Sequence, residues 1–186
     1  SFKTITVSCG VSKKDMLMGK RSTYSRRKND FYPTPYEAIL PLLPHLKDNV
    51  IFDEPCAGKR DLVKHLEKHG HQCARASDIS DKNPIDAFNL SRSGASMFIT
   101  NPPWSRQILL PLIFHLIGLK PTWLLLDGNF LFNKSSADIL KHCHKAVAVG
   151  RVKWIPDSPY TSKDNAMWAF FKQYESETVF CPRLLQ

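Results

Sequence analysis

The sequence contains no apolar run long enough to cross a membrane. Its longest apolar stretches are Ile108–Phe114 and Trp123–Leu126, whereas a membrane-spanning helix needs roughly 20 residues. The first residues are polar and basic rather than apolar, so we expect no signal peptide. These absences predict a protein that has no membrane partner.

Cysteine is too scattered for a disulfide scaffold. The five cysteines are widely spaced and include no C-x-x-C pair, so we expect reduced thiols and a cytoplasmic protein. Two His/Cys segments, 69–73 and 142–144, each hold only three potential zinc ligands. A structural zinc site needs four ligands and a catalytic one needs an organised open set. We therefore expect no metal.

Acidic residues are few relative to basic ones. The 186 residues include 26 Lys and Arg and 17 Asp and Glu, for a net charge of +9. Residues 1–30 hold eight basic and two acidic residues, a net charge of +6. This excess favours an anionic partner, with nucleic acid first, although a solubilising tail is an equal alternative for the arm. We expect a basic arm over 1–30 and a single domain over 31–186.

From residue 31 onward, apolar strand patterns alternate with helical periodicity. Thr34, Pro35 and Glu37 have the spacing of a capping box, with Thr34 as the N-cap of a first helix. Further helices are expected over 61–69, 107–119 and 135–142, and strands over 50–53, 72–77, 96–100, 122–126, 146–149 and 166–171. This alternation predicts an α/β domain with a mostly parallel sheet.

Polar residues stand where these predicted strands end. They are Asp53, Glu54, Asp78, Asn101 and Asp127. Ligands of open α/β sheets bind beyond the carboxyl ends of the strands. We therefore expect a ligand site at this edge of the sheet.

The segment Asn101-Pro102-Pro103-Trp104 directly follows a predicted strand. Two consecutive prolines continue neither a β-ladder nor a helix, so the chain must make a stiff, extended turn. Such a turn can present the Asn101 side-chain oxygen and the Pro102 carbonyl together as acceptors beside an aromatic ring. This arrangement suits a planar amine such as the N6 amino group of adenine. The alternative is a strand-ending turn with a packed tryptophan.

This tetrapeptide resembles the (D/N)-P-P-(Y/F/W) motif of amino-group methyltransferases that use S-adenosylmethionine. It is most similar to that of the adenine-N6 DNA methyltransferases, and residues 151–171 resemble the tail of the small phage and prophage members of this family. Other segments resemble this family in the family's order, namely residues 29–35, the cofactor loop 52–58, Asp78, residues 86–88 and residues 151–171. The resemblance implies a Rossmann-like class I methyltransferase sandwich. Its seven-stranded sheet is mostly parallel with an antiparallel last strand, and helices cover both faces.

The resemblance also implies the site residues. Asn101, Pro102, Pro103 and Trp104 would be catalytic: Asn101 and the Pro102 carbonyl accept the amino hydrogens, Pro103 stiffens the turn and Trp104 stacks on the base. S-adenosylmethionine would be the cofactor. The residues implied to bind it are Tyr32, Thr34, Pro35, Asp53, Glu54, Pro55, Cys56, Ala57, Gly58, Asp78, Ile79, Asp86, Phe88 and Asn101. Within this set Glu54 aligns best with the family's acid because it precedes Pro-Cys-Ala-Gly, and Asp53 would serve the strand end.

One position departs from the family's pattern. The family usually has a second glycine two residues after Gly58, where the backbone passes close to the cofactor, and here Arg60 stands. Glycine is favoured at such places because no Cβ obstructs the approach. Arg60 therefore predicts weaker cofactor binding, a different loop path or a contact with DNA phosphate. It also leaves open a catalytically inactive nucleic-acid-binding relative.

DNA is the expected partner, and RNA is the alternative. The candidate contacts are Arg26, Arg27, Lys28, Arg60, Lys153 and Lys163. No insertion large enough for a separate target-recognition domain is visible, so we expect a short or relaxed recognition site. The same motif chemistry also suits adenine in RNA and glutamine in a protein. A nucleotide-binding dehydrogenase is disfavoured because the sequence lacks G-x-G-x-x-G.

Overall fold

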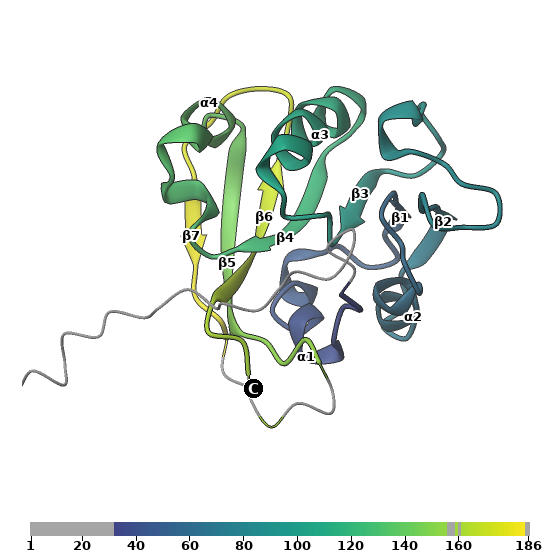
Figure 1. Cartoon of the computed structure of the whole chain (residues 1–186), viewed down its shortest axis with the longest axis horizontal. Helices are drawn as coiled ribbons and strands as arrows, with labels where there is room; N and C mark the ends of the chain where they lie inside the picture. The colour runs from purple at the N-terminus through teal and green to yellow at the C-terminus, as the bar shows by residue number, and fades with distance from the viewer. Residues whose placement is uncertain (1–31, 156–158, 160, 185–186) are drawn as a thin grey trace, which may run out of the picture.

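The computed structural model describes residues 32–155, 159 and 161–184. The described residues form one seven-stranded sheet in the order β2-β1-β3-β4-β6-β5-β7 (Figure 1). The strands are β1 (Ile51–Glu54), β2 (Gln72–Ala76), β3 (Met97–Thr100), β4 (Thr122–Asp127), β5 (Cys143–Arg151), β6 (Asn165–Phe171) and β7 (Val179–Cys181).

The sheet is parallel except for one strand. β1 pairs in parallel with β2 and β3, and β3 with β4. β6 lies antiparallel between β4 and β5, whereas β7 is parallel to β5. The expected mostly parallel, seven-stranded sheet is confirmed. The antiparallel strand is β6, and not the last strand as expected, because the parallel strand β7 follows it in the chain. The sequence patterns did not predict β7, because it is three residues long and two of them are exposed.

Helices cover both faces of the sheet. α1 (Tyr36–Ile39) and α2 (Asp61–Glu67) lie on one face, and α3 (Arg106–Leu119) and α4 (Ala137–Leu140) lie on the other (Figure 1). Short 3-10 turns complete the connections as η2 (Leu43–His45), η3 (Ala87–Asn89), η4 (Phe130–Phe132) and η5 (Lys134–Ser136). None of the helices in the described ranges is long and apolar enough to span a bilayer.

Alternating side chains of β4 divide the core into two layers. Leu124 and Leu126 pack in the cluster that contains the apolar side of α3. Trp123 and Leu125 pack in the opposite cluster, beneath α1 and α2. This two-residue alternation places a β-strand between two apolar layers. In the second layer Trp168 of β6 donates its indole N–H to the Ala38 carbonyl at 2.7 Å, which ties α1 to the sheet.

The first helix differs from its prediction. It begins at Tyr36 with Pro35 as the N-cap residue, and no side chain caps it. The Thr34 hydroxyl instead accepts a hydrogen bond from Asn101 at 3.2 Å, and Glu37 accepts one from the Lys153 backbone N–H at 2.8 Å. The capping-box prediction is therefore wrong, because both side chains are used by tertiary contacts.

The later helices follow the sequence patterns more closely. α2 is followed by Gly70 at φ +83°, a left-handed conformation that suits a glycine stop. α3 has nearly the expected bounds and contains Pro111. The helix expected over 135–142 is one α-turn preceded by a 3-10 turn. The basic arm, including Arg26, Arg27 and Lys28, lies outside the described residues.

Candidate active site

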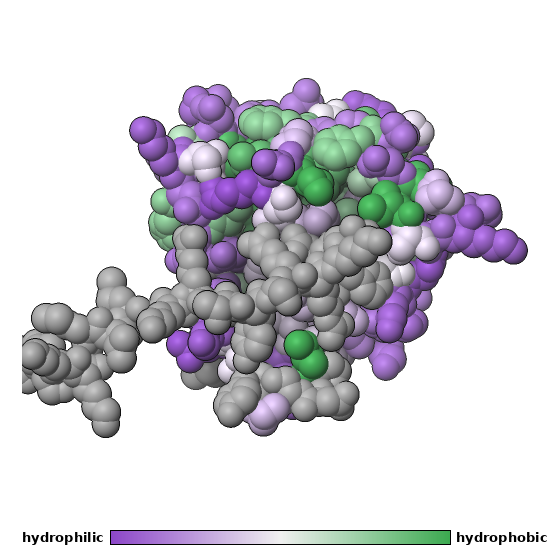
Figure 2. Space-filling model, in the orientation of Figure 1, coloured by the Kyte–Doolittle hydropathy of each residue, from purple (hydrophilic) through white to green (hydrophobic). Residues whose placement is uncertain are grey.

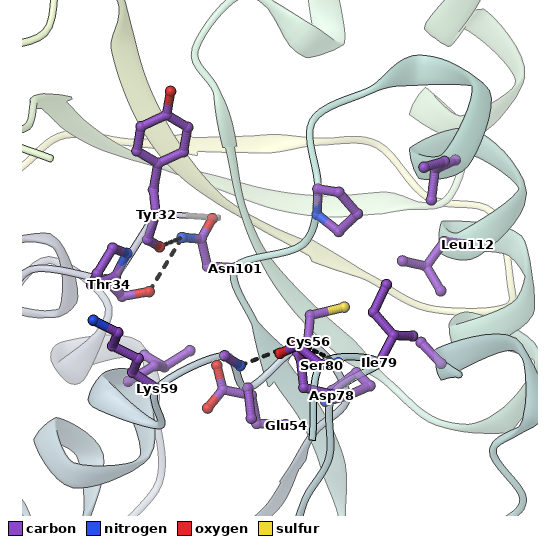
Figure 3. Close-up of a pocket in the computed structure, with 18 of the residues that line it drawn as sticks. Tyr32, Thr34, Glu54, Cys56, Lys59, Asp78, Ile79, Ser80, Asn101 and Leu112 are labelled. Atoms are coloured by element: carbon purple, nitrogen blue, oxygen red, sulfur yellow. Dashed lines mark hydrogen bonds between the residues drawn. The ribbon is translucent and has the colours of Figure 1, made fainter. Parts of the chain in front are cut away.

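A cavity of about 900 Å³ lies at the carboxyl ends of β1, β2 and β3 (Figure 3). Cavities of roughly 300–1,000 Å³ are typical of small-molecule sites. It brings together most of the residues predicted to bind the cofactor or the substrate. Those that line it are Tyr32, Thr34, Glu54, Pro55, Cys56, Ala57, Gly58, Asp78, Ile79, Asp86, Phe88, Asn101 and Pro103.

Glu54 supplies a buried carboxylate to this cavity. Glu54 is 2% exposed, and its carboxylate accepts a hydrogen bond from the Val63 backbone N–H of α2. The Oε2 oxygen has no hydrogen-bond partner among the described residues. Burial, followed by the nearby negative charge of Asp78, raises the pKa of this carboxyl well above its ordinary value. An unpaired buried carboxylate is costly, so the site favours a cation or a hydrogen-bond donor beside Oε2.

Asp78 joins the two loops that form the floor of the cavity. Its Oδ2 accepts the Gly58 backbone N–H at 2.9 Å, from the loop that follows β1. Its Oδ1 accepts the Ser80 backbone N–H at 2.8 Å and the Ser80 hydroxyl at 2.6 Å. The carboxylate is therefore held in one orientation beside the glycine loop, where a ligand hydroxyl can reach it.

Part of the cavity lining is apolar. Ile79 and Phe88 are 57% and 38% exposed, and Ile108 and Leu112 reach the cavity from α3. Asp86 holds this wall by accepting the Phe88 backbone N–H at 2.9 Å. In Figure 2, hydrophobic residues come to the surface near α3, within a largely hydrophilic surround. This wall is suited to a flat, apolar ligand group such as a purine ring.

Asn101 has a defined amide orientation. Its Nδ2 donates to the Thr34 hydroxyl at 3.2 Å and to the Tyr32 carbonyl at 3.4 Å (Figure 3). The Oδ1 oxygen therefore lies on the other side of the amide, away from both partners. This orientation presents an acceptor, and not a donor, to a ligand in the cavity.

The rest of the tetrapeptide is held differently. Pro103 lines the cavity, whereas Pro102 is buried and does not line it. Trp104 does not line it either. Its indole N–H donates to the Leu125 carbonyl at 3.0 Å, and its ring meets the edge of Trp154 at a centroid distance of 5.6 Å. Tyr32 also contacts Trp154 at 6.4 Å, so the three aromatic rings form one cluster beside Asn101.

Asp53 lies apart from this cavity. Its carboxylate is 1% exposed and accepts from Lys120 at 2.9 Å, from Arg75 at 3.2 Å and from the Ser93 hydroxyl at 2.5 Å. Asp127 is also outside the lining, and it accepts the Asn129 backbone N–H at 2.8 Å. Of the five strand-end residues, the structure therefore brings Glu54, Asp78 and Asn101 together at the cavity.

Three of the candidate DNA contacts, Arg60, Lys153 and Lys163, fall within the described ranges. Arg60 pairs with Asp81 at 2.9 Å. Lys153 lines a smaller cavity of about 350 Å³, together with Pro35, Lys59, His65 and Trp154. Lys163 is exposed in the turn before β6. Arg60 and Lys163 are not in the lining of either cavity.

Histidines of the two His/Cys segments make hydrogen bonds with other parts of the chain. His69 hydrogen-bonds the Tyr36 hydroxyl at 3.0 Å, and His71 accepts the Val50 backbone N–H at 3.3 Å. His144 hydrogen-bonds the Tyr174 carbonyl at 3.0 Å. Burial raises the pKa of the Cys143 thiol to about 12. In the part of the chain that the structure describes, no group of three or more His, Cys, Asp or Glu could hold a metal ion.

Several lining residues were not predicted from the sequence. Lys59 and Ser80 adjoin predicted residues and could have been found by extending the loops after β1 and β2. Ile108 and Leu112 are four residues apart, the spacing that places two side chains on one helix face. Pro33 and Ala87 belong to the segments 29–35 and 86–88 that resemble the family, although they were not named as site residues. The further unpredicted residues are Asp61, Leu62 and Ser105.

Neither models of protein families nor curated protein sequences match this chain. Solved structures do resemble it. One is the type I restriction-modification system methyltransferase subunit from Streptococcus thermophilus, with a TM-score of 0.50 and 8% identity over 81% of this chain and 47% of that chain. Another is the type IIG restriction endonuclease BpuSI, with a TM-score of 0.54 and 13% identity over 80% of this chain and 26% of that chain.

The fold is Rossmann-like, of the methyltransferase type. The likeness at these identities shows the fold alone. The chain spans less than half the length of both of these neighbours. Activity, substrate and partners must therefore be argued from the residues of the cavity.

Proposed function

We propose that this chain is an S-adenosylmethionine-dependent methyltransferase that acts on the N6 amino group of adenine in DNA, as in the small phage and prophage enzymes. The observation that carries the proposal is the fixed amide of Asn101. Its Nδ2 is engaged by Thr34 and Tyr32, so Oδ1 is the atom offered to a substrate. An acceptor that cannot turn into a donor suits an amino group and disfavours a carbonyl oxygen.

The cavity fits S-adenosylmethionine. Asp78 offers a carboxylate to a ribose diol, and Phe88, Ile79 and Ile108 offer an apolar wall to an adenine ring. Glu54 Oε2 is a buried acceptor without a partner, which suits a positively charged ligand. When bound, S-adenosylmethionine supplies an electrophilic methyl group on a sulfonium.

The residues at the carboxyl end of β3 would activate the target amine. The lone pair of an exocyclic adenine amine is delocalised into the ring, so the amine is a poor nucleophile. Acceptance of one amino hydrogen by Asn101 Oδ1 would favour a more tetrahedral nitrogen and fix its position, an effect of proximity and electrostatics. The Pro102 carbonyl is the second acceptor that the resemblance implies, although Pro102 itself is outside the cavity lining. The amine proton leaves after transfer, so a strong base is not required.

The lining is consistent with a reaction that uses no covalent protein intermediate. Cys56 is the cavity's thiol, and burial raises its pKa to about 12, which keeps it protonated. No histidine is in the lining of the larger cavity. The described lining residues therefore contain no Cys/His nucleophile pair.

A base presented to Asn101 would lie against the cluster of Tyr32, Trp104 and Trp154. Chemistry on a base requires a nucleotide that is extruded from the duplex or is single-stranded. Aromatic side chains compensate the lost stacking by about 1–3 kcal/mol per base. The net charge of +9 and the cationic rim of Lys59 and Lys153 support a nucleic-acid substrate.

The test is transfer of labelled methyl from S-adenosylmethionine to unmethylated duplex DNA, RNA and a protein extract in parallel. The variant is Asn101→Ala, and Asn129→Ala is the matched control because Asn129 is exposed and follows β4 as Asn101 follows β3. We expect label in DNA as N6-methyladenine. Asn101→Ala should lower the rate by about 10²–10³-fold, with S-adenosylhomocysteine binding retained, and the control should match the wild type.

Other outcomes separate the alternatives. Label only in RNA or only in protein would move the same chemistry to that substrate. Near-wild-type turnover by Asn101→Ala would overturn its assigned role. DNA binding without cofactor binding would identify an inactive relative that keeps the fold.

A further inference from the structure

Arg60 stands where a glycine was expected, and it keeps the backbone conformation that glycine favours. Its φ is +61° and its ψ +27°, in the left-handed region. Its backbone N–H donates to the Ala57 carbonyl at 2.6 Å, which closes the loop between β1 and α2. The loop therefore accepts the arginine at a conformational cost, because a Cβ is disfavoured at this φ.

The Arg60 side chain reaches the second loop of the cavity. Its guanidinium donates to Asp81 Oδ2 at 2.9 Å, and the same oxygen accepts the Asp78 backbone N–H at 3.0 Å. Asp78 in turn accepts the Gly58 N–H at 2.9 Å. We name this connected set of Arg60, Asp81, Asp78 and Gly58 the loop clasp.

The clasp joins the two loops that carry the predicted nucleoside-binding residues. One end lies in the loop after β1 and the other in the loop after β2, and both loops line the cavity. Arg60 is absent from the lining, so it does not occupy the cavity. Its positive charge also opposes the rise in the Glu54 pKa that burial and Asp78 cause.

We propose that Arg60 is a positioning residue for the cofactor, acting through Asp81 to hold Asp78 in the orientation that receives the ribose. This inference rests on the proposed function and deepens it. The strained backbone of a non-glycine residue persists where the surrounding structure uses it. A side chain in place of glycine would by itself disturb the cofactor loop. The ion pair of Arg60 with Asp81 compensates by holding this loop to the loop after β2.

Arg60→Gly separates this role from a merely structural one. Glycine removes the left-handed strain, so the melting temperature of the ligand-free protein should stay the same or rise. The clasp is lost at the same time, so the dissociation constant for S-adenosylhomocysteine should increase by about three- to tenfold. A residue that only stabilised the fold would lower stability and affinity together.

The experiment is calorimetric titration of the full chain with S-adenosylhomocysteine and with 5′-methylthioadenosine, alongside thermal unfolding. The variants are Arg60→Gly, Arg60→Lys, Asp81→Asn and the Arg60→Gly/Asp81→Asn pair. Lys141→Ala is the control, because it breaks another exposed ion pair, with Asp138, outside the cavity lining. We expect similar losses for both ligands, partial recovery in Arg60→Lys, and no additive loss in the double variant.

The outcomes are distinguishable. If the wild-type chain binds both ligands and the dissociation constants of Arg60→Gly and Asp81→Asn are within twofold of the wild-type values, the proposed role of the clasp is overturned. The proposed function is then left intact. Additive losses, or an equal loss in Lys141→Ala, would also overturn it. A wild-type chain that binds neither ligand would overturn the proposed function and this inference with it.

Discussion

The adjacent acids Asp53 and Glu54 are expected to have different roles, so their substitutions should have different effects. Successive side chains of a strand point to opposite faces of the sheet. Asp53 therefore meets Lys120 at the C-terminal end of α3, whereas Glu54 lies under the N-terminal turn of α2 and lines the cavity. We expect Asp53 to govern stability and Glu54 to govern cofactor binding.

Asp53→Asn removes the counter-charge of a buried ammonium. Lys120 is 7% exposed and pairs with Asp53 at 2.9 Å, and its ammonium also contacts the Ser93 hydroxyl and the ring of Phe98, whose centroid is 5.0 Å away. Breaking a buried ion pair costs about 3–5 kcal/mol. Because Lys120 retains a hydroxyl and a ring, we expect about 3 kcal/mol, which lowers the melting temperature by roughly 6–12 °C.

Glu54→Gln should affect cofactor affinity and the pH dependence of stability, and it should not cause the loss of stability expected for Asp53→Asn. The pKa of Glu54 is raised in the folded protein, so the folded state binds its proton more tightly than the unfolded state. Wild-type stability should therefore fall as the pH rises from the ordinary value of 4.5 to the raised pKa, by about 1.4 kcal/mol per pH unit. Glu54→Gln should lack this fall and bind S-adenosylmethionine at least about tenfold more weakly.

The assay is thermal unfolding from pH 4.5 to 8 combined with titration of cofactor. An Asp53→Asn variant that keeps wild-type stability but loses cofactor affinity would refute this division of roles. A Glu54→Gln variant that retains the wild-type pH dependence of stability would refute it as well. Lys120→Met paired with Asp53→Asn tests the ion pair itself, because the double variant should recover part of the lost stability.

Single contacts give three further predictions. Thr34→Val removes the acceptor that orients the Asn101 amide, so methyl transfer should fall by about tenfold with cofactor affinity little changed, as measured by steady-state kinetics and titration. Trp168→Phe leaves the buried Ala38 carbonyl unpaired and should cost about 1–3 kcal/mol in urea unfolding. Gly128→Ala places a Cβ 3.1 Å from the Asn165 backbone oxygen, so its urea midpoint should be lower than that of a Gly94→Ala control, whose Cβ meets open space.

Local patterns predicted most of the sheet because its strands are short apolar runs with two-residue alternation. β4 has five consecutive buried residues and was recognisable as a strand. β7 was not recognisable, because its pairing with β5 depends on a chain segment that returns from β6. The helix at Tyr36 illustrates the same limit, since Thr34 fits an N-cap locally but bonds Asn101, 67 residues away.

The sequence alone determined which residue types stand at the carboxyl ends of the strands. Strand period and proline stereochemistry are local properties, so Glu54, Asp78 and Asn101 could be assigned to one edge before the strands were paired. Residue type alone did not distinguish the role of Asp53 from that of Glu54, because both are acids at the same strand end, and only the resemblance favoured Glu54.

Only the tertiary structure decided how these residues are used. Lys120 forms an ion pair with Asp53, and Arg60 forms one with Asp81. Thr34 accepts a hydrogen bond that orients the amide of Asn101. Each choice joins residues that are 21 to 67 positions apart in the chain. Such contacts form when packing brings distant segments together, and residue type and spacing do not encode that geometry locally.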